Sequence, residues 1–190
     1  MKKHTYILSV DAETDGLWGK SFAIAAIVYD TESGNILNKF TARIPDSFVS
    51  NQWVKENVLP TLENNFPVTH ETREEMLADF AVFYNKYREY VPVLWHMGHV
   101  VEAQLFRELV ELKLIGEWDA PYCPIEVASI LETIGYEKPD SVDSYAKENN
   151  LEISDYGTTH NPLYDCEVAA KVYIAIYQKT NRKADNWIKR

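Results

Sequence analysis

The most constraining stretch of this sequence is an apolar run that ends in two closely spaced acids. Residues 5–10 (TYILSV) have the pattern of a buried β-strand, and Asp11 and Glu13 follow directly. Alternate residues of a strand point to the same face, so the two carboxylates are expected to lie side by side. Such a pair either raises its own pKa values or binds a cation, and hard oxygen ligands suit Mg²⁺ or Mn²⁺. An acidic strand end facing solvent gives the same short pattern, so partners elsewhere in the chain must decide.

Two more apolar runs follow the first. Residues 22–29 and 36–44 both predict strands, and residues 32–35 between them (ESGN) have turn chemistry. Pro45 is expected to end the third strand, because proline lacks the N–H that continues a ladder. Three strands joined by short connections predict an antiparallel meander.

The middle of the chain alternates helix and strand signals. Residues 51–67 predict a short helix and a loop, whereas residues 72–75 (TREE) form a capping box in front of a helix that runs to Tyr87. Residues 91–96 then predict a strand, which a helical crossover would place parallel to an earlier one. These elements indicate one α/β domain over residues 1–190.

A third acid lies at the start of the next predicted helix, residues 100–114. Its inward face is expected to carry Val101, Leu105, Leu109 and Leu112, with Glu102 and Phe106 on the adjoining flank. Glu102 would emerge just past a strand end, at the edge where open α/β sheets place their sites. An acid stabilised by the helix dipole is the ordinary alternative.

A polar segment, residues 149–159, precedes the last predicted helix and places His160 at the start of that helix. Asn161 can cap the helix, and Pro162 fits its first turn. Asp165 is predicted to share the inward face with an apolar stripe of Val168, Val172 and Ala175 or Ile176. Because an unpaired buried charge is costly, Asp165 is expected to have a partner.

Composition limits the classes of protein that this chain can belong to. With 190 residues, 46% hydrophobic and 25% charged, it is typical of a globular domain. It contains no apolar run long enough to span a bilayer, so we expect a soluble, cytoplasmic protein. Cys123 and Cys166 have no metal-ligand spacing and are expected to be reduced, packed thiols. Residues 179–190 form a short basic tail, which we expect to be solvated rather than in contact with phosphates.

The order of the acidic motifs resembles a known family. Asp11-x-Glu13-Thr14-x-Gly16-Leu17, an acid early in a middle helix, and His160-x-x-x-x-Asp165 together resemble the histidine-containing DEDDh branch of the DEDD exonuclease superfamily. The resemblance spans residues 11–165. It implies the ribonuclease H-like fold, in which helices flank a mixed sheet made of an antiparallel three-strand meander and parallel strands.

The resemblance also implies a mechanism: metal-dependent removal of nucleoside 5′-monophosphates from the 3′ end of short or single-stranded nucleic acid. Asp11 would contact two divalent ions, Mg²⁺ or Mn²⁺, while Glu13 and Asp165 would help to hold the first. Glu102 would take the place of the second motif's acid, and His160 would be the general base. Two ions can stabilise the attacking and leaving oxygens at phosphorus, and an imidazole can accept a proton near neutral pH.

Substrate contacts are expected after Glu13. The backbone from Thr14 through Gly16 to Leu17 could meet the terminal nucleotide, and Leu17 and Trp18 offer apolar surfaces for a base. Trp18 could equally be a packing aromatic. His99 is expected near the substrate groove. The formal net charge of −10 argues against a broad grip on duplex nucleic acid, but ions at the carboxylates could hold one strand end.

The sequence departs from the family pattern in its second motif. That motif commonly has Asn four residues before Asp, whereas this chain has Gly98 and Glu102. Either the helix sits slightly further back, or the second ion is held less well. Two alternative functions therefore remain. One is a catalytically impaired module that binds nucleic acid or protein, and the other is hydrolysis of a non-nucleic phosphodiester. A transition-metal site of His96, His99 and Glu102 is a further alternative, although its spacing fits no common zinc motif.

Two properties are not specified by any motif. No residue identifies a contact to the 2′-hydroxyl, so the sequence does not specify ribose or deoxyribose, and we favour RNA or mixed specificity. The resemblance to dimeric relatives, together with the aromatic-rich surface elements, leaves room for a homodimer.

Overall fold

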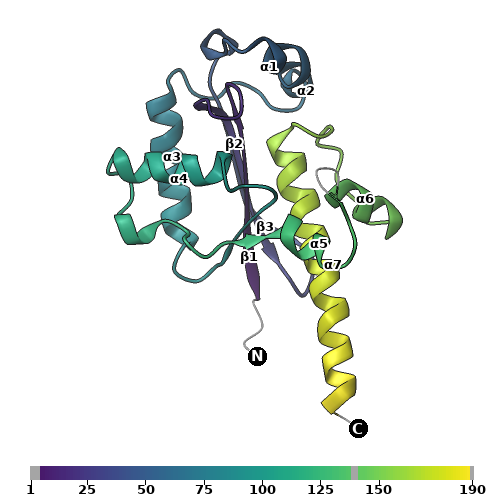
Figure 1. Ribbon diagram of the computed structural model, residues 1–190. Helices are drawn as coiled ribbons and strands as arrows, with labels where there is room; N and C mark the ends of the chain where they lie inside the picture. The colour runs from purple at the N-terminus through teal and green to yellow at the C-terminus, as the bar shows by residue number, and fades with distance from the viewer. Residues whose placement is uncertain (1–4, 138–140, 189–190) are drawn as a thin grey trace.

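A five-stranded mixed sheet forms the centre of the molecule (Figure 1). The computed structural model describes residues 5–137 and 141–188, with side chains described as far as Thr180. The strands are β1 (Tyr6–Thr14), β2 (Ser21–Asp30), β3 (Ile36–Arg43), β4 (Val93–Trp95) and β5 (Ile125–Glu126), and their order across the sheet is β3-β2-β1-β4-β5. The central position of β1 places the first acidic motif inside the fold.

The pairing of the strands confirms the predicted mixed sheet. β1, β2 and β3 form the antiparallel meander, whereas β4 pairs in parallel with β1 and β5 pairs in parallel with β4. On β1, Asp11 lies opposite Ala25 and Glu13 lies opposite Ala23, and the register shifts between Glu13 and Thr14. Small residues of β2 therefore stand beside the acidic end of β1.

Helices cover both faces of the sheet. α3 (Arg73–Tyr87) and α4 (Val101–Glu111) lie on one side, and α5 (Val127–Glu132), α6 (Ser141–Glu148) and α7 (Pro162–Ile188) lie on the other (Figure 1). The predicted capping box is present, because the Thr72 hydroxyl accepts from the Glu75 N–H while the Glu75 carboxylate accepts from the Thr72 N–H. The prediction for Leu112 is wrong: α4 ends before it, and its side chain is 46% exposed.

The remaining short elements border one end of the sheet or connect the larger ones. α1 (Gln52–Asn57) and α2 (Leu59–Leu62) lie beyond the end of β2 at the top of Figure 1, and the 3₁₀ turns are η1 (Asp46–Phe48) and η2 (Glu117–Asp119). The backbone of α7 continues to Ile188, so the predicted basic tail is helical as far as that residue. The side chains of the predicted basic tail after Thr180 lie outside the described residues. Within the described ranges, no helix is long and apolar enough to cross a membrane.

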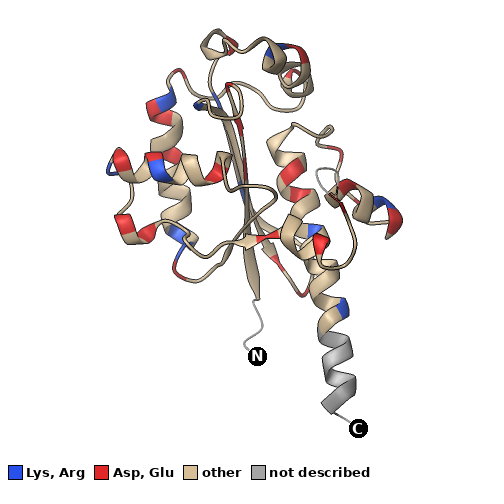
Figure 2. Cartoon of the chain, viewed as in Figure 1, with Lys and Arg blue, Asp and Glu red and all other residues tan. Residues whose placement is uncertain are grey.

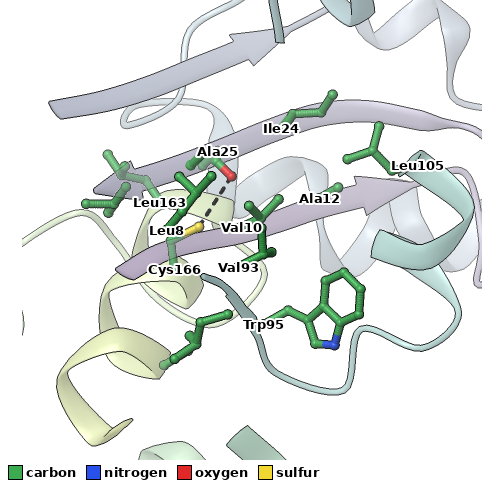
Figure 3. Close-up of a cluster of buried hydrophobic side chains, with 14 of the residues drawn as sticks. Leu8, Val10, Ala12, Ile24, Ala25, Val93, Trp95, Leu105, Leu163 and Cys166 are labelled. Carbon is green, nitrogen blue, oxygen red and sulfur yellow. Dashed lines mark hydrogen bonds between the residues drawn. The ribbon is translucent and has the colours of Figure 1, made fainter. Parts of the chain in front are cut away.

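The core lies between β1 and its helices (Figure 3). Val10 and Ala12 are buried on β1, and Leu105 of α4 and Leu163 of α7 approach from opposite sides. Cys166 is a buried thiol whose Sγ lies 3.3 Å from the Ala25 carbonyl oxygen. Cys123, in contrast, is exposed, so only one of the two predicted packed thiols is packed. The tight packing around β1 fixes where its acidic end points.

Candidate active site

Three carboxylates converge at the end of β1. Asp11 and Glu13 project from one face of the strand, and Asp165 reaches them from the first turn of α7. One oxygen from each can be chosen so that all three lie within 4.8 Å of one another. Figure 2 shows acidic residues on β1, α4 and the first turns of α7, the elements that surround this point. Three hard oxygen ligands this close together form an arrangement that can hold a divalent ion.

Burial makes this cluster unfavourable without a cation. Burial raises the pKa of Asp11 to about 7, and it also raises the pKa of Asp165 well above its usual range. The pKa of Glu13 is raised first by burial and then by the charges of Asp11, Asp165 and Glu102. A divalent ion would offset the repulsion between the carboxylates, because its positive charge stabilises their ionised forms. The donor chemistry therefore fits Mg²⁺ or Mn²⁺.

Glu102 is held differently from the other acids. Its side chain is 3% exposed, and its Oε1 accepts a hydrogen bond of 3.0 Å from the Ala12 N–H. Ala12 lies between Asp11 and Glu13, so this bond ties α4 to the acidic strand end. Burial, followed by the charge of Asp11, raises the pKa of Glu102 well above its usual range. Glu102 faces the same cavity as the three clustered acids but does not belong to their close group.

Gly98 makes room for the Glu102 carboxylate. A Cβ on Gly98 would lie 2.7 Å from Glu102 Oε2 and 2.5 Å from the ring of Trp95. Glycine at position 98 therefore leaves the space that the longer side chain of Glu102 occupies. The two departures from the family's second motif are sterically linked.

His160 lies on a loop and is fixed through its backbone. Its φ of 71° is left-handed, and its N–H donates to Asp165 Oδ2 at 2.9 Å. The hydroxyl of Thr61, on α2, lies 2.9 Å from the His160 carbonyl oxygen and 2.8 Å from that of Val58. The imidazole Nδ1 is 3.9 Å from Glu13 Oε1. Burial lowers the pKa of His160, so a neutral ring able to accept a proton is favoured at neutral pH.

A cavity of about 530 Å³ brings most of the predicted site together. It is lined by all five predicted acid and imidazole side chains and by three of the predicted substrate residues, namely Thr14, Gly16 and Leu17. Trp18 and His99 are not among its lining residues, and Trp18 is 74% exposed. The structure therefore does not place these two residues in the cavity wall, and their contact with a substrate stays a prediction.

His96 occupies the place expected for His99. It lines the cavity, and its Nε2 lies 3.3 Å from the Ser141 hydroxyl, whereas His99 is exposed. The alternative metal site needed His96, His99 and Glu102 to converge, yet only His96 and Glu102 share the cavity. Among the described residues, the metal-binding geometry is found at Asp11, Glu13 and Asp165.

Sequence reasoning missed several residues of the cavity wall, among them Trp53 and Asp143. Trp53 of α1 lines the cavity, and its ring meets the His160 ring edge-on at 5.5 Å between centroids. Asp143 of α6 also lines it and accepts a 2.8 Å hydrogen bond from the Tyr164 hydroxyl. Trp53 lies in the predicted short helix, but no motif connected that helix to the acids. Its role depends on a contact that only the folded chain makes.

Asp15 joins the acidic loop to α1. Its carboxylate accepts from the Ser50 N–H at 3.0 Å, the Ser50 hydroxyl at 2.6 Å and the Asn51 N–H at 2.7 Å. These hydrogen bonds outweigh the effect of partial burial and lower the pKa of Asp15. Asn51 in turn caps α1 by accepting from the Val54 N–H. Leu17 and Trp53 consequently line one cavity although 36 residues separate them.

Comparison with known proteins identifies the fold. No protein-family model and no curated protein matches the chain. The nuclease domain of 3′hExo, a DEDDh family member bound to rAMP, has a TM-score of 0.63 at 13% identity, over 93% of both chains. Exonuclease X in complex with 5′ overhanging duplex DNA has a TM-score of 0.58 at 19% identity, over 92% of this chain and 93% of the other. A 3′-exonuclease that recognises the 3′ end of a histone mRNA stem-loop has a TM-score of 0.64 at 12% identity, over 94% and 84%. The chain thus shares the mixed-sheet fold of these exonuclease structures.

Proposed function

We propose that this protein is a metal-dependent 3′-to-5′ exonuclease that hydrolyses phosphodiester bonds at the 3′ end of short or single-stranded nucleic acid. One observation carries the proposal: acids from three distant segments and an imidazole line a single cavity in the fold of known exonucleases. Its products would be nucleoside 5′-monophosphates.

The proposed metal ligands are Asp11, Glu13, Glu102 and Asp165. Bound divalent ions would polarise the phosphodiester and stabilise the charge that develops on its oxygens. Asp11, Glu13 and Asp165 supply the close oxygen cluster, while Glu102 presents its carboxylate from the α4 side of the cavity. We expect two ions, Mg²⁺ or Mn²⁺, with Glu102 contributing to the second.

His160 is the proposed general base. Burial favours its neutral form, and the Asp165 carboxylate accepts from its backbone N–H, so Asp165 orients the residue without consuming a ring nitrogen. The imidazole would take the proton from the attacking water, which is a role that requires a basic nitrogen beside the reacting phosphate. Asp165 would then serve both the ions and the position of the base.

The substrate is proposed to enter between Leu17 and Trp53. Both side chains are largely exposed, at 61% and 56%, and both line the cavity. Each therefore offers an apolar surface to a nucleobase, and stacking of this kind is tolerant of sequence. A cavity of about 530 Å³ suits a strand end rather than a long duplex. The similar structures include complexes with RNA and with DNA, so the choice of sugar stays a question for experiment.

Domain organisation and assembly are also proposals. Residues 7–174 contribute buried residues to a single continuous core, which supports one exonuclease domain over residues 1–190. A homodimer is compatible with the exposed aromatic side chains of Tyr90, Trp118 and Tyr122.

A second candidate function is a catalytically impaired module that binds nucleic acid or protein. The position of Glu102 favours it, because this acid bonds to the Ala12 N–H and stays outside the close group of three. A module of this kind would bind one ion at Asp11, Glu13 and Asp165 without hydrolysing a substrate.

One experiment distinguishes the two functions. Single-stranded RNA and DNA of identical sequence, labelled at the 5′ end, are incubated with Mg²⁺, Mn²⁺ or chelator and with wild type or His160→Ala. The exonuclease proposal expects a ladder that shortens from the 3′ end, requires metal and is lost in the variant. Intact substrate in every lane would reject it in favour of the binding module.

A further inference from the structure

Glu126, at the end of β5, holds the loop that leads to α4. Its Oε1 accepts from the Met97 N–H at 2.8 Å and from the Ala128 N–H at 3.1 Å, and its Oε2 accepts from the Gly98 N–H at 3.2 Å. One carboxylate thus caps α5 and binds two successive N–H groups of the loop after β4. The strand pairing makes this possible, because Glu126 lies opposite Trp95 in the parallel ladder.

The loop that Glu126 binds has an unfavourable conformation. Met97 has a left-handed φ of 59°, which costs free energy for a residue with a side chain. Gly98 packs so closely that an added Cβ would clash with both Trp95 and the Glu102 carboxylate. A backbone held in this way needs external hydrogen bonds, and the Glu126 carboxylate supplies two of them.

A chain of contacts connects Glu126 to the acidic strand end. Gly98 lies against Glu102 Oε2, and Glu102 Oε1 accepts from the Ala12 N–H between Asp11 and Glu13. The Gly98 carbonyl also accepts from the Ala103 N–H in the first turn of α4. A displacement of the loop would therefore move both the carboxylate of Glu102 and the helix that carries it.

From this geometry we propose that Glu126 is a positioning residue for Glu102, acting through the backbone of Met97 and Gly98. It touches neither the cavity nor a substrate; it fixes the loop so that the longer acid of this chain reaches the Ala12 N–H beside the other carboxylates. This role deepens the proposed function and rests on it for its catalytic consequence. The positioning itself can be measured without any metal.

The test uses Glu126→Gln, which is nearly isosteric. Its single carbonyl oxygen can take the place of Oε1 and keep the cap of α5, while its NH₂ group faces the Gly98 N–H and cannot accept from it. Glu126→Asp is the second variant: Asp is a good N-cap but is too short to reach the loop. The control is Glu137→Gln, which removes the same charge from an exposed glutamate.

The first readout is amide hydrogen exchange of the metal-free protein. Loss of one hydrogen bond in Glu126→Gln predicts exchange at Ala12 that is about fivefold faster, and loss of both loop bonds in Glu126→Asp predicts a larger increase. Exchange should be unchanged in the control. The second readout is Mn²⁺ binding by calorimetry, where affinity for the weaker ion should fall about tenfold, as is usual for outer partners of metal ligands. Melting temperatures that stay close to wild type would separate these effects from general unfolding.

The outcomes distinguish the positioning role from the proposed function. Unchanged exchange at Ala12 in the folded Glu126 variants would overturn the positioning role, as would an equal effect in the control. Faster exchange at Ala12 in a protein whose wild type degrades no nucleic acid would support the positioning role while rejecting the exonuclease. If wild type is active, the proposal further requires a lower kcat/KM in both Glu126 variants that added Mn²⁺ partly restores.

Discussion

The two halves of the candidate site are built in different ways. Asp11 and Glu13 lie on the central strand, where both are paired with β2, and Glu102 bonds directly to the strand between them. His160 and Trp53 come instead from a loop and a six-residue helix, and the backbone of His160 is left-handed. The packed core thus fixes the positions of the carboxylates, whereas the position of His160 depends on a few hydrogen bonds.

This difference suggests separate roles for rigidity and adjustment. Ligands for ions must keep their spacing, and a strand packed at crystal-like density provides it. A base and a stacking aromatic must accommodate a substrate, and short elements joined by side-chain hydrogen bonds permit small movements. Asp165 connects the halves, because it belongs to the acid cluster and also accepts from the His160 N–H.

Asp11→Asn should cause the largest loss, because it breaks the strand-borne half. Removing this proposed metal ligand should reduce activity by about a thousandfold or more, which corresponds to several kcal/mol of lost charge stabilisation. It should also abolish the rise in melting temperature that Mg²⁺ or Mn²⁺ produces in wild type. Activity assays and thermal melts with and without ions check both effects. A variant that keeps its metal-dependent shift would contradict the assignment of Asp11.

His160→Ala should disable the loop-borne half alone. Loss of a general base is expected to lower the rate by about a hundredfold. The metal-dependent rise in melting temperature should persist, since the carboxylate cluster is untouched. Comparing single-turnover rates with thermal melts separates the two halves. If the rise disappeared together with the activity, the halves would not be independent.

Thr61→Val should produce a smaller effect on the same half. The variant keeps the shape of the side chain but removes the hydroxyl that the carbonyls of Val58 and His160 share. Loss of one hydrogen bond of about 1 kcal/mol predicts a rate about fivefold lower, with little change in metal affinity. Thr61→Ser is the matched control and should retain most of the activity. Equal rates for Thr61→Val and wild type would show that the hydroxyl does not hold His160.

The dependence of stability on pH should sharpen the account of the acid cluster. Burial raises the pKa of Asp11 from 3.8 to about 7, so between these values the folded protein holds a proton that the unfolded chain has lost. Stability without metal should therefore decrease as pH rises through that window. Thermal melts from pH 4.5 to 7.5 in chelator should show this decrease, and Mg²⁺ should reduce it. A melting temperature that does not change with pH in chelator would mean that burial does not raise the pKa of Asp11.

Much of the fold follows from local patterns in the sequence. The three apolar runs became β1, β2 and β3, and the TREE segment capped α3 as predicted. These patterns depend on residues within a few positions of one another, so they can be recognised without knowledge of the tertiary structure. Leu112 shows the limit of such reasoning, because the helical period continued in the sequence after α4 had ended.

The sequence by itself determined that Asp11 and Glu13 share one face, because the period of a strand requires it. It also indicated, through motif order, that Glu102, His160 and Asp165 would join them, and the cavity contains all five. Only the tertiary structure decided that His96 rather than His99, and Trp53 rather than Trp18, faces that cavity. These choices depend on a left-handed turn at Met97 and on hydrogen bonds that Asp15 accepts from residues 35 and 36 positions away. Strand periodicity is a local property, whereas the direction in which a loop presents its side chains is set by the distant groups that bind its backbone.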